Sequence, residues 1–130
     1  MGFFSKLLGI TPKKQPVHID DETFTKEVLQ SKIPVILDVW GPNCAPCRQL
    51  EPIIMGLAAQ YDGRVKVCEM TPELAPRTSV RLKVMGTPTV IYFTKGREVE
   101  RVVGLRGTLF HEETIAHHFG IGREPTGEPS

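Results

Sequence analysis

The stretch 38–52, "DVWGPNCAPCRQLEP", places two cysteines three positions apart, directly after an apolar run that contains an aspartate. The run "VILDVW", 35–40, is rich in β-branched residues and predicts a strand buried on both faces. The segment 44–61 that follows predicts a helix, with Pro52 inside it as the cause of a kink. Cys44 therefore falls where a buried strand gives way to a helix.

Further strands and helices alternate along the chain. The sequence predicts strands at 64–70 and 89–93, a hairpin partner at 98–103, and a short edge strand near 17–19. Strand–helix alternation that ends in a hairpin implies an α/β fold, with a mixed sheet covered by helices on both faces.

Three more helical segments are expected. The first begins at Asp20 or Asp21 as N-cap, the second is a short stretch within 71–82, and the third spans 108–121 and starts near Gly107 or Thr108. In the first helix we expect Phe24, Val28 and Leu29 to face inward, and in the last helix Leu109, Ile115 and Phe119.

Length and composition indicate one ordinary globular domain. The chain has 130 residues, 40% of them hydrophobic, and a formal net charge of +1. This balance gives no reason to expect nucleic acid as a partner. We divide the chain into an N-terminal extension (1–16), a domain (17–119) and a flexible C-terminal tail (120–130).

The expected cellular compartment is inferred from residues 1–10. Residues 1–10 have no basic region before their apolar stretch and no small-residue cleavage site after it, so they make a poor signal peptide. We expect a tail that packs on the domain or frays, with an amphipathic contact to a membrane or partner as the alternative. The predicted location is the cytoplasm, where disulfides are transient.

The two close cysteines suit redox chemistry. The free N–H groups and the dipole at a helix start favour a thiolate at Cys44. Cys47 lies about one turn later and can attack a mixed disulfide on Cys44 intramolecularly, while Pro46 stiffens the turn. A structural bridge is disfavoured by the expected compartment.

A zinc site is the other alternative, because zinc needs four ligands and the pair supplies two. The remaining candidate ligands are scattered along the chain: Cys68, His18, His111, His117 and His118.

Asp38 is the second clue to function. A carboxylate within an apolar strand is costly to bury, and burial should raise its pKa. Such an acid near the dithiol can take the proton of Cys47 and later return it. The alternative is an aspartate at a strand end that reaches solvent or caps a turn.

The combined motifs resemble the thioredoxin family. They are "LDVW" (37–40), "CAPC" (44–47), Pro52, "MGTPTVIYF" (85–93), "KG" (95–96) and "VVG" (102–104). The resemblance covers about residues 17–119. It implies a thioredoxin fold with a central mixed sheet of four or five strands flanked by helices on both faces.

The resemblance also implies roles for single residues. Cys44 matches the attacking cysteine, Cys47 the resolving cysteine and Asp38 the buried acid. Trp40 is expected to pack against the active-site loop and to take part in substrate binding with Asn43, and Gly86 to shape the substrate groove. Of the remaining pair, Thr87 would offer its backbone to an extended substrate, and Pro88 would be the cis-proline opposite the dithiol.

Three positions depart from the pattern of typical thioredoxins, which read Trp-Cys-Gly-Pro-Cys. Asn43 replaces the tryptophan and Ala45 the glycine, which bears on substrate range and on redox tuning. Glu69 stands where a lysine is often found near the buried acid. If Glu69 approaches Asp38, the two carboxylates should couple, and one should be pushed toward its protonated form.

The sequence therefore predicts a thiol–disulfide oxidoreductase of the protein-disulfide reductase type. No organic cofactor and no metal is expected, because the dithiol carries the electrons. The expected partners are protein disulfides and an electron donor, either a thioredoxin-reductase-like protein or a small thiol, and the expected state is a monomer. A binding or chaperone module without redox turnover is the alternative. Cys68 is interpreted as a small core residue, with a regulatory thiol as the alternative.

Overall fold

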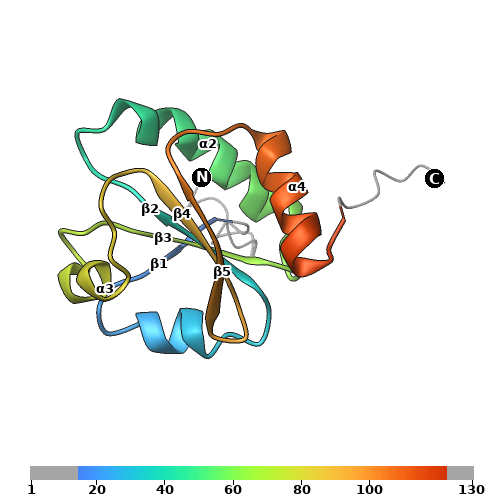
Figure 1. The fold of residues 1–130 in the computed structure, drawn as a ribbon, viewed down its shortest axis with the longest axis horizontal. Helices are drawn as coiled ribbons and strands as arrows, with labels where there is room; N and C mark the ends of the chain where they lie inside the picture. Colours follow the sequence, from blue (N-terminus) through green and yellow to red (C-terminus); the bar gives the residue numbers. More distant parts are fainter. Residues whose placement is uncertain (1–14, 123–130) are drawn as a thin grey trace, which may run out of the picture.

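Five strands form a single mixed sheet in the order β1–β3–β2–β4–β5 (Figure 1). The structure is a computed structural model that describes residues 15–122. The strands are β1 (Val17–His18), β2 (Val35–Val39), β3 (Lys66–Met70), β4 (Thr89–Thr94) and β5 (Arg97–Val103). β3 pairs in parallel with β1 and β2, whereas β4 runs antiparallel to β2 and β5 antiparallel to β4. The predicted mixed sheet and its hairpin are confirmed.

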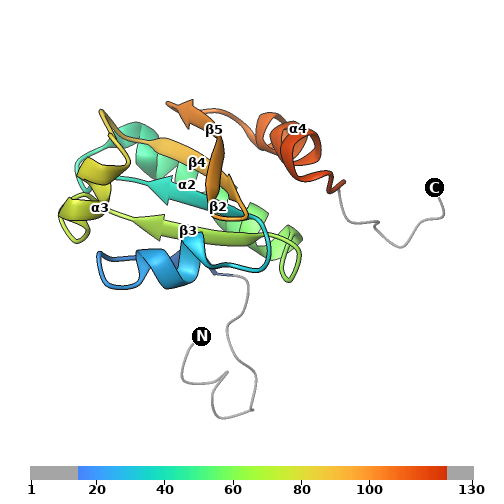
Figure 2. The ribbon, with the colours of Figure 1, turned by 60° about the horizontal axis from the view of Figure 1, so that its bottom comes forward.

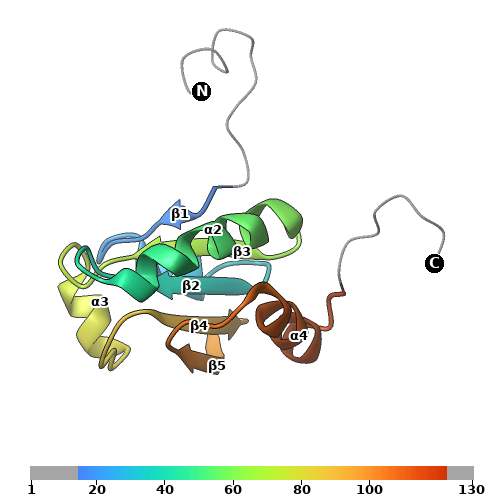
Figure 3. The ribbon, with the colours of Figure 1, turned by 90° about the horizontal axis from the view of Figure 1, so that it is seen from above.

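Helices cover both faces of this sheet, as predicted. They are the π-helical turn η1 (Thr25–Leu29), α2 (Ala45–Gln60), α3 (Pro76–Arg81) and α4 (Thr108–Phe119). α2 and α4 pack on one face, and Figure 3 shows α2 running across β2 and β3. η1 and α3 lie on the opposite face, which Figure 2 brings forward.

The alternation of side chains along β2 divides the core into two layers. Ile36 points into the cluster with α2 and α4, whereas Leu37 points into the cluster with η1 and α3. Asp38 is two residues from Ile36 and therefore faces α2. In β3, Cys68 belongs to the opposite layer and Glu69 to the face of α2.

The last helix presents a different face from the one predicted. Ile115 is fully buried as expected, but Leu109 is 67% exposed, so its inward placement was wrong. His111 is fully buried instead and contacts the hydroxyl of Tyr92 in β4. A histidine reads as polar in a hydrophobic pattern, and for this reason the pattern placed the wrong residue in the core.

The two aspartates near the first helix act as caps, but neither is the N-cap of η1, which is Phe24. Asp20 accepts hydrogen bonds from the backbone N–H groups of Glu22 and Thr23, both at 2.9 Å, in the turn before η1. Asp21 instead accepts the backbone N–H of Thr78 at 2.8 Å, in the first turn of α3.

Some predictions fall on residues outside the described range. The amphipathic segment within residues 1–10 and its membrane or partner contact are among them, as is most of the C-terminal tail. Within 15–122, no helix combines the length and the apolar character needed to cross a membrane.

Candidate active site

The dithiol lies at the start of α2, with its two cysteines in different environments. Cys44 is the N-cap residue with extended backbone, and its side chain is half-buried. Cys47 is buried, and its backbone N–H lies 3.2 Å from Cys44 Sγ. The two sulfurs are joined in a disulfide, with Cα atoms 5.2 Å apart. Cys44 is therefore accessible to solvent, whereas Cys47 is buried beneath it.

The residues between the cysteines begin the helix. Ala45 is its first residue, exposed to solvent, and Pro46 follows in the first turn, where a missing N–H costs little. Pro52 lies inside α2. Asn43, just before the N-cap, is also exposed.

The loop before β4 faces the nucleophile. The Thr87–Pro88 peptide bond is cis, and the Thr87 carbonyl oxygen lies 3.6 Å from Cys44 Sγ. A Cβ at Gly41 would lie 3.3 Å from Thr87 Oγ1, so glycine allows this close approach of the two loops. Gly86 accepts a hydrogen bond from the Thr89 hydroxyl at 2.6 Å.

A shallow groove of about 350 Å³ opens at Cys44. Its lining consists of the approach loop, the nucleophile, the segment after β3 and the loop before β4: Gly41, Pro42, Asn43, Cys44, Pro72, Glu73 and Thr87. Pro72 and Glu73 were not predicted to take part.

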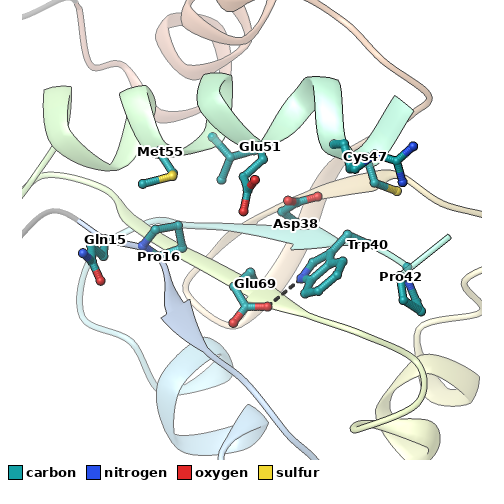
Figure 4. Close-up of a pocket in the computed structure, with 12 residues that line it drawn as sticks. Gln15, Pro16, Asp38, Trp40, Pro42, Cys47, Glu51, Met55 and Glu69 are labelled. Carbon is teal, nitrogen blue, oxygen red and sulfur yellow. Dashed lines mark hydrogen bonds between the residues drawn. The ribbon is translucent and has the colours of Figure 1, made fainter. Parts of the chain in front are cut away.

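A second cavity of about 360 Å³ lies behind Cys47 (Figure 4). Asp38 lines this cavity and is 5% exposed, and its Oδ1 has no hydrogen-bond partner among the described residues. Burial, followed by the negative charges of Glu69 and Glu51, raises the pKa of Asp38 to about 7. Asp38 can therefore exchange a proton near neutral pH beside the resolving cysteine.

Glu69 is held by two neighbours. The Trp40 indole N–H donates a hydrogen bond to Glu69 Oε1 at 2.6 Å, and His18 Nδ1 lies 2.7 Å from Oε2. Trp40 also lines the cavity together with Gly41 and Pro42 of the active-site loop. Glu69 and Asp38 are register partners and line the same cavity, which is the condition under which coupling of the two carboxylates was expected.

Glu51, which lines this cavity, and His18, which contacts Glu69 next to it, were not predicted from the sequence. Glu51 comes four residues after Cys47, which puts both on one face of a helix, so this spacing could have revealed it. His18 pairs with Glu69 across β1 and β3, and no local pattern in the sequence announces that register.

The third cysteine and two of the histidines lie elsewhere. Cys68 is fully buried on the other face of the sheet, and burial raises its pKa to about 12. His111 is buried against Tyr92, and His118 hydrogen-bonds Glu100 at 3.0 Å. Among residues 15–122, no three histidine, cysteine or acidic side chains are grouped so that they could hold a metal ion.

Comparison with known proteins agrees with this geometry. The family model of thioredoxin matches residues 15–116. The chain belongs to the thioredoxin family. Thioredoxin 1 of Nostoc sp. is 34% identical over 100 residues, which cover 77% of this chain and 94% of that protein.

Other thioredoxins are similarly related. Thioredoxin of Synechocystis sp. is 36% identical over 86 residues, which cover 66% of this chain and 80% of the relative. The chloroplastic M-type thioredoxin of Spinacia oleracea is 32% identical over 91 residues, which cover 70% of this chain and 50% of the relative. As a family member with the dithiol in place, the chain is a thiol–disulfide oxidoreductase.

Proposed function

We propose that this thioredoxin-family protein reduces disulfides of other proteins, with Cys44 as nucleophile, Cys47 as resolving thiol and Asp38 as proton acceptor. The observation that carries the proposal is the arrangement at the start of α2. A half-buried sulfur faces an open groove, and a buried sulfur and a buried carboxyl share the cavity behind it.

The reaction proceeds in two exchanges. The Cys44 thiolate attacks one sulfur of the substrate disulfide, forms a mixed disulfide and releases the first substrate thiolate. Cys47 gives its proton to the Asp38 carboxylate and attacks Cys44 Sγ. The Cys44–Cys47 disulfide forms, the second substrate thiolate leaves, and two electrons have passed to the substrate.

The groove at Cys44 supports binding of an extended substrate segment. The Thr87 carbonyl lies beside the nucleophile and offers a backbone acceptor, a form of strand addition. Asn43 and Gly86 are exposed next to the nucleophile and to Thr87, and Pro88 follows Thr87 through the cis peptide bond. We assign these residues and Trp40 to substrate binding. Ala45, Pro46 and Glu69 are assigned to tuning of the dithiol.

The proposed cycle takes its electrons from a thioredoxin-reductase-like protein or a small thiol. It uses no organic cofactor or metal, because the Cys44–Cys47 pair stores both electrons. We place the protein in the cytoplasm as a monomer that takes part in electron transfer and redox homeostasis. Cytosolic thiol pools keep disulfides transient, which supports the placement of a redox-active dithiol in this compartment.

A resolving-cysteine variant tests the roles directly. Cys47→Ser should retain the attacking thiol but stop at the mixed disulfide, so covalent adducts with substrate proteins should accumulate on a non-reducing gel. Cys44→Ser should form none and should lose turnover in insulin reduction with dithiothreitol. Full multiple turnover by Cys47→Ser would show that the roles are wrongly assigned, and no acceleration by the wild type would favour a pure binding module.

A further inference from the structure

Three carboxylates from three elements line the cavity behind Cys47. Asp38 in β2 and Glu69 in β3 are register partners in parallel strands, so their side chains lie on the same face of the sheet. Glu51 reaches the cavity from α2 above them. Figure 4 shows the three carboxyl groups around one space, with Cys47 at its end.

The Glu69 carboxylate has a defined orientation within this group. Trp40 follows β2 and His18 belongs to β1, and these strands flank β3 in the sheet. Each of these residues contacts a different oxygen of Glu69, at 2.6 and 2.7 Å. The Glu69 side chain is only 23% exposed. Its charge is therefore held near Asp38 instead of being free to turn into solvent.

Like charges that line one cavity favour protonation of the most buried member of the group. That member is Asp38, since Glu51 is exposed and Glu69 is only partly buried. Arg48 is the cation on α2 that lines the cavity, and it is exposed to solvent, which screens its charge. From β4, the register partner of Asp38 is Val90, which is uncharged.

We propose that Glu69 is a positioning residue that acts through Asp38: Trp40 and His18 fix its carboxylate, and its charge adds to the effect of burial in favouring the protonated form of Asp38 in the oxidised protein. This inference rests on the proposed function, in which Asp38 exchanges a proton with Cys47. If it is right, Glu69 affects the step in which an electron donor reduces the Cys44–Cys47 disulfide back to the dithiol.

When the disulfide is reduced, Asp38 must be protonated in order to donate a proton to Cys47. A thiolate of a dithiol electron donor attacks Cys44 Sγ, the Cys44–Cys47 bond breaks, and Cys47 leaves with the bonding electrons. Asp38 gives its proton to the departing Cys47 sulfur. The second donor thiol then attacks the mixed disulfide, which releases the Cys44 thiolate and leaves the donor oxidised.

Titration of the Asp38 carboxyl carbon by NMR in the oxidised protein tests the positioning role without any turnover. We expect Glu69→Gln and Glu51→Gln each to lower the midpoint by about one pH unit, because each removes a like charge. Glu69→Asp, which keeps the charge, should return the midpoint toward that of the wild type. Glu113→Gln is the matched control, because it removes an exposed carboxylate on α4. An unchanged midpoint in Glu69→Gln would overturn the inference, whatever the result for Glu51→Gln.

The second measurement is the rate at which dithiothreitol reduces the oxidised protein at pH 7. If the midpoint falls from about 7 to about 6, the protonated fraction of Asp38 falls roughly fivefold, and Glu69→Gln should be slower by a similar factor. A shifted midpoint with an unchanged rate would also overturn the proposal. Should the proposed function fail instead, the wild type would not reduce insulin, whereas the NMR titration would still report the effect of Glu69.

Discussion

The three cysteines of this protein differ chiefly in the surroundings of their sulfur atoms. Cys44 is the N-cap of α2 and borders an open groove, so the helix dipole and solvent both favour its thiolate. Cys47 is buried three residues later beside an acid. Cys68 is enclosed by apolar side chains on the opposite face of the sheet. Reactivity at this scale follows from exposure and local charge.

We expect Cys68 to remain unmodified in the folded, reduced protein. With its pKa raised to about 12 by burial, roughly one thiol in ten thousand is ionised at pH 8. Iodoacetamide labelling followed by mass spectrometry should therefore show modified Cys44 and unmodified Cys68 until denaturant is added. Cys68→Ser should reduce insulin at the wild-type rate. Rapid native labelling of Cys68 would indicate a regulatory thiol instead.

At the scale of elements, α2 anchors the active site to the sheet. Its inward side carries Leu50, Ile54 and Leu57, all of them buried in the cluster with β2, β3 and β4. The same face carries Cys47 one turn earlier than Leu50, so packing of this side sets the position of the dithiol.

Truncation of the inward side of α2 should destabilise the whole domain. Leu57→Ala removes a fully buried side chain and is expected to lower the free energy of unfolding by about 2–5 kcal/mol. Gln49→Ala, an exposed position on the same helix, should change it by less than about 0.5 kcal/mol. Urea denaturation of the oxidised protein measures both values, and equal losses would contradict this account of the core.

At the scale of the whole molecule, two buried titratable groups act on stability in opposite directions. Burial raises the pKa of Asp38 to about 7, so the folded state binds more protons than the unfolded chain and stability falls as pH rises from about 4 to 7. Burial, followed by the charge of Arg106, lowers the pKa of His111 to about 4. The unfolded chain then binds the extra proton, and stability rises from about pH 4 to 6.5.

These opposed contributions nearly cancel between pH 4.5 and 6.5 in the wild type. Asp38→Asn removes the contribution that falls as pH rises. The free energy of unfolding of this variant, relative to that of the wild type, should therefore increase by about 1.4 kcal/mol per pH unit across this range. The double variant Tyr92→Phe, His111→Leu lacks the rising contribution. Its free energy of unfolding relative to the wild type should therefore fall as pH rises. Urea unfolding of the oxidised proteins at three pH values gives these differences. A constant difference for Asp38→Asn would show that Asp38 does not titrate in this range.

Local patterns in the sequence were sufficient for the elements and for the dithiol. Alternation and β-branched runs located the strands, and the Cys-Ala-Pro-Cys spacing after a buried strand placed Cys44 at the start of a helix. These features depend on neighbours within a few residues, which the chain order specifies directly. The pattern misplaced Leu109, because an exposed leucine and a buried histidine reverse the usual preference.

Only the tertiary structure decided which distant side chains share the cavity behind Cys47. Trp40 and Glu69 line it together because β2 and β3 pair side by side, and Glu51 joins them from α2. His18 of β1 contacts Glu69 from outside the cavity lining. The same register placed Cys68 on the far face of the sheet. Chain order determined the chemistry available at the active site, whereas strand pairing across the sheet determined which charges surround its buried acid, because electrostatic interactions depend on distance in space and not on separation along the chain.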